Sequence, residues 1–461
     1  MKGVLDGLPE SLDETYERVL RNINKANREH AYRLLQCITV AVRPLRVEDL
    51  AEVLAVDYDA ARCGGIPKSK PDWRWADQHQ AVLSTCSSLI AIVDHGDSRV
   101  VQFSHFSVKE FLTSDRIAHS SGDVSRYHIL LSPAHTILAQ ACLGILLRLD
   151  EHVTKDNALE IPLARYAAEC WVDHAQFEDV SSHIQDVMEY FFDADKPHWA
   201  AWRRVYDMDL LSWSNFCPEE MIPGAVPLYY AALCGFHDLT KHLIVKNPEH
   251  VNARGGKMVT PLVAALHRNH FRVADLLHGH GADVNPRGWL ERTPLHVASF
   301  HGHVNIVQWL FHHGADVNAR NVHHSVPLHY ACDRGKLEIS RMLLERNADI
   351  NARGRWGLVP LHFATASIGA EDRLELMQLL LDHGADANAR DDDRCTPLHH
   401  SSHWKKEDYS PYTGTVEGSR LLLDHGADIN AENSEGKTPI KVALEAGHHK
   451  MAEFLSSQGA Q

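Results

Sequence analysis

The C-terminal half of the chain repeats one pattern of apolar and polar positions. Each copy begins with Thr or Val and Pro, followed by a mostly apolar run, as in TPLHVA (293–298) and VPLHYA (326–331). Successive prolines of this pattern lie 33 or 34 residues apart four times, and then 37 and 42 residues apart. The prolines stand at positions 227, 261, 294, 327, 360, 397 and 439. A nearly fixed period of this length predicts like units stacked in a row, since no unit can bury its apolar face alone.

Each unit is predicted to contain two helices. Pro suits the first helical position because its missing N–H needs no partner there, and a Thr before it can cap the helix. A second apolar run at helical spacing follows and ends at a glycine, as in NIVQWLFHHG (305–314). Val226, Val326 and Val359 replace Thr at the cap, and a lost cap costs about 1 kcal/mol. We therefore expect these three units to open more readily in hydrogen exchange.

The segment AENSEGKT (431–438) resembles a relaxed phosphate-binding loop. In such a loop, Lys437 would reach a phosphate and Thr438 would hold Mg²⁺. That chemistry requires a buried strand before the loop, whereas Pro439 follows at once and the repeat pattern surrounds the segment. We interpret Gly436 as a turn residue and Thr438 as a helix cap.

The N-terminal half has a different pattern. A capping box, Ser11 and Glu14, opens a predicted helix at 8–24. Three more helices and a hairpin that turns at 94–97 follow, which is the order of a winged helix. The predicted elements are helices at 30–42, 47–57 and 75–89, and a hairpin with a final helix at 88–112.

The third of these helices would enter DNA in a winged helix that reads sequence. It carries Asp77 and no Lys or Arg, so the main electrostatic term of DNA binding is missing. We expect a structural winged helix. Residues 121–220 look helical throughout, with Trp171, Trp199 and Trp202 as core or junction residues.

Two families share these patterns. The repeats resemble ankyrin repeats, in which a β-turn finger precedes two antiparallel helices. The segments GLPESLDETYERVL (7–20), RPLRVEDLAEVLAVD (43–57), QFSHFSVKEFLTS (102–114) and PLARYAAECWVDHA (162–175) resemble fungal NACHT–ankyrin proteins similar to NOD-like receptors. In that family a NACHT NTPase precedes the first segment. Because Met1 lies close to that segment, we expect no nucleotide-driven switch, unless Met1 is not the true start and the NTPase is encoded upstream of it.

The expected fold is mainly α, with an N-terminal winged helix, a helical linker domain and a C-terminal solenoid of about seven ankyrin repeats. The expected domains are an N-terminal helix at 1–24, the winged helix at 25–120, the helical linker at 121–220 and the repeats at 221–461.

Composition narrows the class of function. The chain of 461 residues has a net charge of −15, which argues against coating nucleic acid or an anionic membrane. Nine cysteines include no C-x-x-C pair, so neither a disulfide framework nor a thiolate zinc site is indicated. The N-terminus lacks the apolar stretch of a signal peptide. We expect the cytoplasm or the nucleus as the location.

No catalytic motif stands out. The chain contains neither G-x-S-x-G nor H-E-x-x-H, so we expect no enzyme activity, no cofactor and no small-molecule substrate. Four of the 34 histidines fill the TPLH position of the repeat. His399 and His403 have the i,i+4 spacing of metal ligands, but no third ligand is evident and we expect no metal site.

In ankyrin-like proteins, partners contact the fingertips and the exposed positions of the inner helices. Exposed Trp and Arg mark interaction sites, so we expect a protein interface here. The alternative is that these side chains fold back on neighbouring fingers. The fingertip residues are Lys257, Trp289, Leu290, Arg292, His323, Arg355, Trp356 and Leu358. The inner-helix residues are His267, Arg268, Phe300, His301, Asp333, Arg334, His403 and Trp404.

A ladder of equivalent arginines accompanies these positions. Two interpretations stay open, namely binding of an acidic peptide and ordinary packing against the next finger. The ladder consists of Arg254, Arg287, Arg320, Arg353 and Arg390.

The expected function is a non-catalytic scaffold or regulator that binds a protein partner through its ankyrin face, as in NOD-like receptors of fungi. The alternative is a nuclear co-regulator of transcription, for example of a fungal secondary-metabolite gene cluster, that does not read DNA itself. Neither requires direct contact with nucleic acid or membrane.

Overall fold

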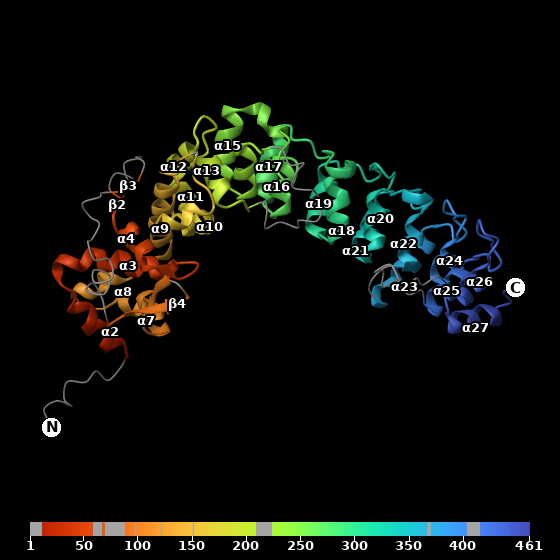
Figure 1. Ribbon diagram of the computed structural model, residues 1–461, viewed down its shortest axis with the longest axis horizontal. Coiled ribbons are helices and arrows are strands. Elements are labelled where there is room, and N and C mark those ends of the chain that lie inside the picture. The colour runs from red at the N-terminus through yellow and green to blue at the C-terminus, as the bar shows by residue number, and fades with distance from the viewer. Residues whose placement is uncertain are drawn as a thin grey trace, which may run out of the picture. The chain divides into compact units, whose positions relative to one another are not determined.

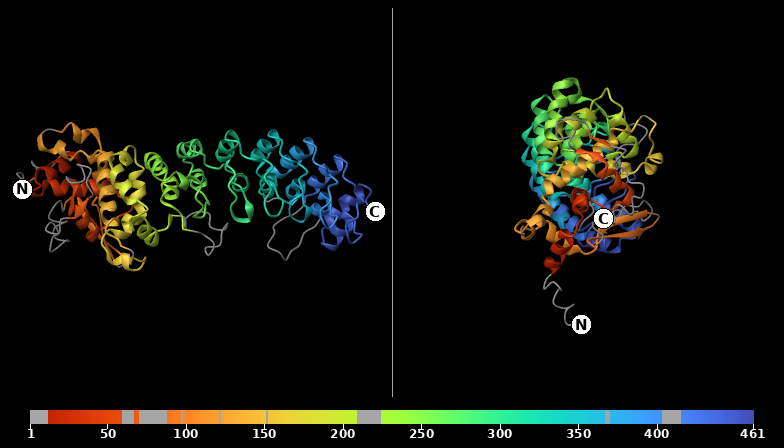
Figure 2. Two further views of the ribbon diagram at one scale, coloured as in Figure 1. Left: turned by 90° about the horizontal axis from the view of Figure 1, so that it is seen from above. Right: turned by 90° about the vertical axis from the view of Figure 1, so that its left-hand side faces the viewer.

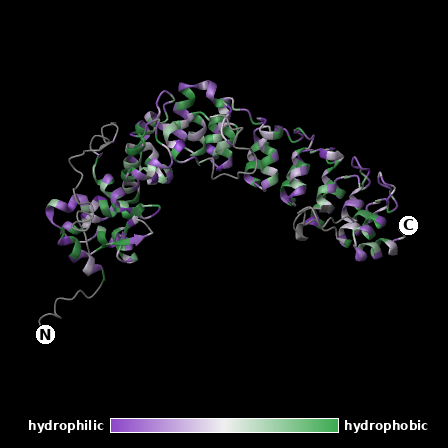
Figure 3. Ribbon diagram, in the orientation of Figure 1, coloured by the Kyte–Doolittle hydropathy of each residue, from purple (hydrophilic) through white to green (hydrophobic). Residues whose placement is uncertain are grey.

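The computed structural model describes residues 12–58, 67–69, 88–96, 98–120, 122–150, 152–208, 224–366, 370–402 and 415–461. These residues form two compact units, which meet in sequence between Ala253 and Arg254. Figure 1 labels their helices and strands. Each unit is described by itself. The helices carry both hydrophobic and hydrophilic positions, as amphipathic helices do (Figure 3). No helix of the described ranges is both long and apolar enough to span a membrane.

The N-terminal unit begins with helices and a small antiparallel sheet. Strands β4 and β5 form the predicted hairpin and β1 adds to its open side, with Leu45 opposite Val101. The predicted helix at 75–89 lies almost wholly outside the described residues. The elements are α2 (Leu12–Arg21), η1 (Lys25–Asn27), α3 (Arg28–Val40), β1 (Leu45–Arg46), α4 (Val47–Leu54), β2 (Val56–Asp57), β3 (Lys68–Ser69), β4 (Ile90–His95), β5 (Ser98–Phe103), α7 (Phe106–Leu112) and α8 (Asp115–Ala118).

A helical segment continues this unit. Its aromatic core contains Trp171 and Trp202, both buried, with ring centroids 5.6 Å apart. The Trp171 ring also lies 5.4 Å from that of Phe236 in the first repeat, which confirms its predicted junction role. The elements are η3 (Gly122–Tyr127), α9 (Leu131–Leu146), η4 (Asn157–Glu160), α10 (Ala164–Ala175), α11 (Val180–His183), α12 (Gln185–Phe191) and α13 (His198–Val205).

One buried carboxylate joins the winged helix to the helical segment. Asp49, on α4, accepts hydrogen bonds from the Arg46 guanidinium at 2.8 Å and from the Leu163 N–H at 2.6 Å. Leu163 precedes α10 and has a left-handed backbone with φ of 66°. Because Asp49 satisfies a backbone donor that no helix or strand can pair, it fixes the start of α10.

Seven helix pairs follow, and every inner helix begins at the proline that the sequence pattern marked. The first pair, α14 (Pro227–Leu233) and α15 (His237–Lys246), belongs to the N-terminal unit and is followed by η7 (Pro248–Asn252). The pairs of the C-terminal unit are α16 (Pro261–His267) and α17 (Phe271–Gly279), α18 (Pro294–His301) and α19 (Val304–His312), α20 (Pro327–Asp333) and α21 (Leu337–Glu345), α22 (Pro360–Ala366) and α23 (Ala370–Asp382), α24 (Pro397–Ser402) and α25 (Val416–Asp424), and α26 (Pro439–Glu445) and α27 (His449–Ser457).

The pairs of the C-terminal unit form two rows. From α18 to α26 the inner helices pack one on the next, and from α19 to α27 the outer helices do the same (Figure 2). The fingers between pairs contain η8 (Trp289–Glu291) and η9 (Arg355–Gly357). This arrangement confirms the predicted solenoid of two-helix units.

Four buried histidines each link one repeat to the finger of the next repeat. We call His296, His329, His362 and His399 the repeat histidines. In each, Nδ1 accepts the N–H of the residue three positions earlier, at 3.0–3.1 Å. Nε2 lies 3.0–3.2 Å from a carbonyl oxygen of the next finger. Only the neutral tautomer with its proton on Nε2 satisfies both contacts.

The hydrogen bond to Nδ1 of a repeat histidine also satisfies the N–H of the residue at the cap position of the inner helix. Val326 and Val359 donate their N–H groups to His329 and His362, as Thr293 does to His296. A Val in the cap position therefore keeps this hydrogen bond. The predicted capping role of the Thr438 hydroxyl is wrong, because that hydroxyl donates instead to the carbonyl of Gln461 at 3.3 Å.

The AENSEGKT segment forms a finger turn, as the repeat pattern predicted. The Asn433 N–H donates to the Lys437 carbonyl at 3.0 Å, and Gly436 has a left-handed backbone with φ of 69°. The Lys437 ammonium lies 2.7 Å from Glu435 and from Glu445. Hydrogen bonds to these carboxylates raise the pKa of Lys437.

Candidate protein-binding surface

Four of the five ladder arginines bind the backbone of the neighbouring finger. Arg287 Nη1 donates to the carbonyl of Arg320 at 2.5 Å, and Arg353 Nη1 to that of Arg390 at 2.6 Å. Arg254 and Arg320 make the same contact with Arg287 and Arg353. This is the geometry that the packing interpretation of the ladder predicts.

Two ladder arginines also have carboxylate partners from other fingers. Arg320 Nη2 lies 3.6 Å from Asp349, and Arg353 Nη2 lies 3.1 Å from Asp392. The sequence shows no Asp directly after either arginine, but the fold supplies one from the next finger. The guanidinium groups of this ladder therefore hold fingers together.

Two fingers present a tryptophan at a strained tip. Leu290 in η8 and Trp356 in η9 share a left-handed backbone with φ of 56°. The ends of each tip are joined by a hydrogen bond, from the Gly288 N–H to the Arg292 carbonyl at 2.9 Å and from the Gly354 N–H to the Leu358 carbonyl at 2.8 Å. Trp289 is 38% exposed and Trp356 is 62% exposed.

Gly354 is needed where it stands. A Cβ at this position would lie 2.7 Å from Ser325 Oγ and 2.9 Å from His329 Nε2. The finger that carries Trp356 therefore packs directly on the repeat histidine His329, and this contact fixes the position of the finger.

A continuous row of arginine and aromatic side chains runs from one repeat to the next within the C-terminal unit. Arg292 lies between Trp289 and Tyr330, with its guanidinium carbon 5.4 and 5.0 Å from the two ring centroids. Its Nε donates to Tyr330 Oη at 3.0 Å. The Tyr330 ring lies 6.2 Å from that of Phe300, over which the Arg334 guanidinium sits at 4.0 Å. We call these five residues the arginine–aromatic row.

A similar pair lies at the next tip, where the Arg355 guanidinium is 3.8 Å from the centroid of Trp356. Stacking of this kind is worth about 0.5–1 kcal/mol at exposed sites. It holds the guanidinium planes in one orientation, and so pre-organises their N–H edges for a ligand.

Tyr330 was missed by the sequence analysis. It follows the repeat histidine of VPLHYA, in a position filled by Val297 and Phe363 in neighbouring units. In the sequence, Tyr330 differs from the Phe of the next repeat by a single hydroxyl. That hydroxyl matters because it accepts from Arg292, which lies 38 residues away in the sequence. Asn321 also donates to this hydroxyl, at 2.7 Å.

The other predicted residues lie around this row. His301 is half-buried and its ring stacks on His303 at 5.8 Å. Burial, and then the neighbouring His303, lower the pKa of His301 to about 4. Burial raises the pKa of Asp333, which lies 3.5 Å from Arg334 Nε. Leu290, His323 and Leu358 are half-buried.

The remaining predicted positions add less to the surface. Lys257 and His267 are half-buried, and Arg268 is exposed. Burial, and then Arg268, lower the pKa of His267 to about 4. His403 and Trp404 lie outside the described residues.

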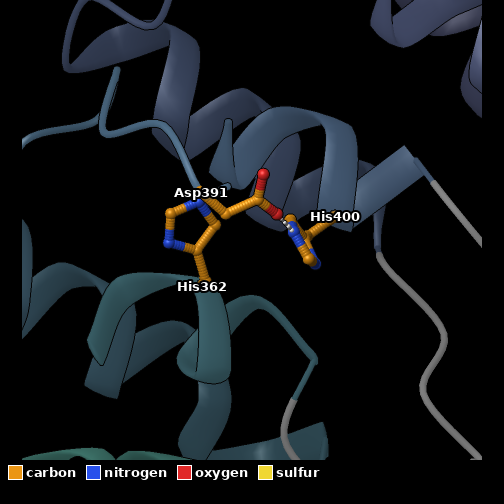
Figure 4. Close-up of side chains that lie close together, drawn as sticks. All are labelled: His362, Asp391 and His400. Atoms are coloured by element: carbon orange, nitrogen blue, oxygen red, sulfur yellow. Dashed lines mark hydrogen bonds and ion pairs between the residues drawn. The ribbon is translucent and has the colours of Figure 1, made fainter. Parts of the chain in front are cut away.

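One group has the composition of a metal site. Atoms of His362, Asp391 and His400 lie within 4.8 Å of one another (Figure 4). His400 Nε2 donates to Asp391 Oδ2 at 2.8 Å. Although burial opposes it, this contact holds the pKa of Asp391 below its ordinary value.

His362 has no nitrogen to spare for a metal. As a repeat histidine it accepts from the Val359 N–H and donates to the Cys395 carbonyl. Asp391 Oδ1 also accepts from the N–H groups of Asp393 and Cys395. We interpret the trio as part of a repeat junction. His399, which has the i,i+4 spacing of a metal ligand with His403, likewise uses both nitrogens.

Comparison with known proteins agrees with this architecture. A family model described as ankyrin repeats (3 copies) matches residues 228–321, 322–391 and 361–461. A model described as GPI inositol-deacylase, winged helix domain, matches residues 16–123. The predicted mainly helical fold, with a winged helix before ankyrin repeats, is confirmed.

The chain is also similar to a fungal protein, "Azaphilone pigments biosynthesis cluster protein L" of Monascus ruber. The two are 31% identical over 299 residues, which is 60% of this chain and 61% of that protein. The match thus spans less than two thirds of the relative's length.

Proposed function

Because the chain belongs to the ankyrin-repeat proteins, we propose that it is a non-catalytic interaction protein that binds a protein partner through residues 289–358. The observation that carries this proposal is the arginine–aromatic row, together with the exposed Trp356. Trp, Tyr and Arg are the residue types most enriched at energetic centres of protein interfaces. Their fixed orientation lowers the entropy lost on binding.

This face is built for contact rather than for reaction. The tips are held by backbone hydrogen bonds and by the ladder arginines. Of the nearby histidines with a lowered pKa, His296 and His329 are buried and bonded on both nitrogens. These contacts support rigidity, which suits a docking surface.

Affinity capture followed by mass spectrometry tests the proposal. Wild type is compared with Trp289→Ala/Trp356→Ala and with a control, Val245→Ala/Leu444→Ala, which removes exposed apolar side chains elsewhere on the chain. We expect a protein captured by wild type and control to be lost from the tryptophan variant. Equal capture by all three would exclude this face.

A second candidate is a nuclear co-regulator of transcription. It is favoured by the similarity to a protein whose name places it with pigment biosynthesis in a fungus. Fluorescent tagging in a filamentous fungus, with transcript measurement after deletion, tests it. Nuclear signal and altered transcripts of a metabolite cluster are expected. A cytosolic protein whose deletion leaves transcripts unchanged would return the choice to the first candidate, a scaffold or regulator that resembles the NOD-like receptors of fungi.

A further inference from the structure

Charge is unevenly distributed along the repeats. Residues 254–358 contain 13 Lys and Arg against eight Asp and Glu, a net charge of +5 in a chain of −15. Residues 359–461 contain nine against 17, a net charge of −8. The basic stretch coincides with the arginine–aromatic row and the Arg355–Trp356 pair.

We propose that this surface recognises a short, extended protein segment in which Asp or Glu alternates with apolar side chains. The inference rests on the proposed function and names the chemistry of its partner. Its carboxylates would pair with Arg334 and Arg355, and its apolar side chains would contact Trp289 and Trp356.

The fold separates two kinds of arginine on this face. The ladder arginines Arg287, Arg320 and Arg353 direct N–H groups to backbone carbonyls of the next finger. Arg334 and Arg355 are exposed, and their planes lie 4.0 and 3.8 Å from the rings of Phe300 and Trp356. Stacking covers the face of a guanidinium and leaves its edge, which is the part that binds a carboxylate with two parallel hydrogen bonds. The acidic ligand is thus assigned to the stacked arginines.

The exposed tryptophans are the reason for proposing apolar side chains in the bound segment. Trp356 lies against Arg355 and is 62% exposed. In an extended segment, neighbouring side chains point to opposite sides and every second one shares a face. A segment that alternates charge and apolar character can therefore place carboxylates on the arginines and apolar groups against the rings.

The dimensions indicate a short segment. Trp289, Arg334 and Arg355 belong to three successive fingers or inner helices, about 20 Å along the array at about 10 Å per packed helix. At about 3.3 Å per extended residue, roughly six to eight residues cover that distance.

A long polyanion fits less well. Glu291 and Asp333 flank the stacked arginines, and the following repeats are acidic. Nucleic acid, with one charge per 1.7 Å of duplex, would have to continue over that region. The favoured partner is therefore a protein segment, and nucleic acid is an outcome of the test.

Selection from a phage-displayed random octapeptide library tests the inference. The full chain is the bait, and synthetic copies of enriched peptides are then measured by fluorescence polarisation. We expect enrichment of Asp or Glu alternating with apolar residues. Their affinity is expected to fall at least tenfold for Arg334→Gln/Arg355→Gln, and at least tenfold between 0.1 and 1 M NaCl, where the Debye length shrinks to about 3 Å.

The matched control is Arg341→Gln/Arg346→Gln. It also removes two positive charges, and Arg346 is likewise stacked, 5.0 Å from Phe311, but on the outer helices. We expect this control to bind the peptides as wild type does. Enrichment of neutral or basic peptides, equal loss in both double variants, or competition by an oligonucleotide would overturn the inference. Capture that depends on Trp289 and Trp356 would leave the proposed function standing in each of those cases.

Discussion

At the scale of the residue, the repeat histidines tie stability to pH. Burial lowers the pKa of His296 and His329 to about 4 and that of His362 to about 3. The unfolded chain, with a histidine pKa near 6.5, therefore takes up protons first as the pH falls. Their contribution to stability is complete above about pH 7 and declines as the pH falls from 6.5 toward 4.

We expect the free energy of unfolding to fall below pH 6.5 by about 1.4 kcal/mol per pH unit for each of these histidines. His329→Gln should make this dependence shallower by about one such increment, because one fewer proton is taken up on unfolding. Urea unfolding at several pH values measures both. The exposed His312→Gln is the control, and an unchanged slope in His329→Gln would contradict the assignment.

Trp356 is proposed to bind a partner, and we expect it to contribute little to the stability of the fold. We expect Trp356→Asn to change the free energy of unfolding by less than about 0.5 kcal/mol. Asn accepts a left-handed backbone more readily, which offsets the lost ring contacts. Trp309→Ala, at a buried position where the indole donates to Asp275 at 2.7 Å, should cost about 3–5 kcal/mol. Thermal unfolding compares the two, and similar losses would show that Trp356 supports the fold.

At the scale of the element, Asp49 is the contact through which α4 orders the start of α10. We expect Asp49→Ala to destabilise the N-terminal unit by about 3 kcal/mol, because the half-buried Arg46 guanidinium and the buried Leu163 N–H lose their acceptor. Glu29→Ala removes an exposed carboxylate that pairs with Arg33 at 2.6 Å, and should cost less than about 1 kcal/mol. Calorimetry of both variants checks the difference, and equal melting temperatures would refute the role of Asp49.

The helix starts show what the sequence can predict at this scale. All seven inner helices begin at the expected prolines, because that signal is local to one turn of chain. The capping contacts were assigned less well. The Thr438 hydroxyl reaches Gln461, 23 residues away, and the N–H groups of two cap valines are taken by histidines. Such partners depend on which side chain lies within reach in the folded unit.

For the candidate surface too, the sequence predicted the local features and missed the contacts between residues far apart in the chain. The exposure of Trp289 and Trp356 followed from their place at the fingertips. The ladder was recognised as periodic, but its two interpretations could be weighed only once the carbonyl partners, 33 to 37 residues away, were known. Tyr330 escaped notice for the same reason, since its ring acts through Arg292.

At the scale of the whole molecule, the proposed absence of catalysis can be tested directly. We expect isothermal titration calorimetry of the full chain with Mg·ATP to show no saturable heat, because Lys437 is paired with Glu435 and Glu445 in a turn that leads into α26. Saturable binding that disappears in Lys437→Ala would revive the phosphate-loop interpretation and the enzyme hypothesis.

The bond from four of the ladder arginines to the neighbouring backbone has an evolutionary consequence. A carbonyl is present whatever amino acid occupies the accepting position, so the contact from Arg287 to residue 320 makes no demand on the side chain there. Substitutions at the exposed tips can accumulate while the scaffold beneath them stays intact. Descendants of one ancestral array can in this way acquire new binding preferences by exchanging a few tip residues.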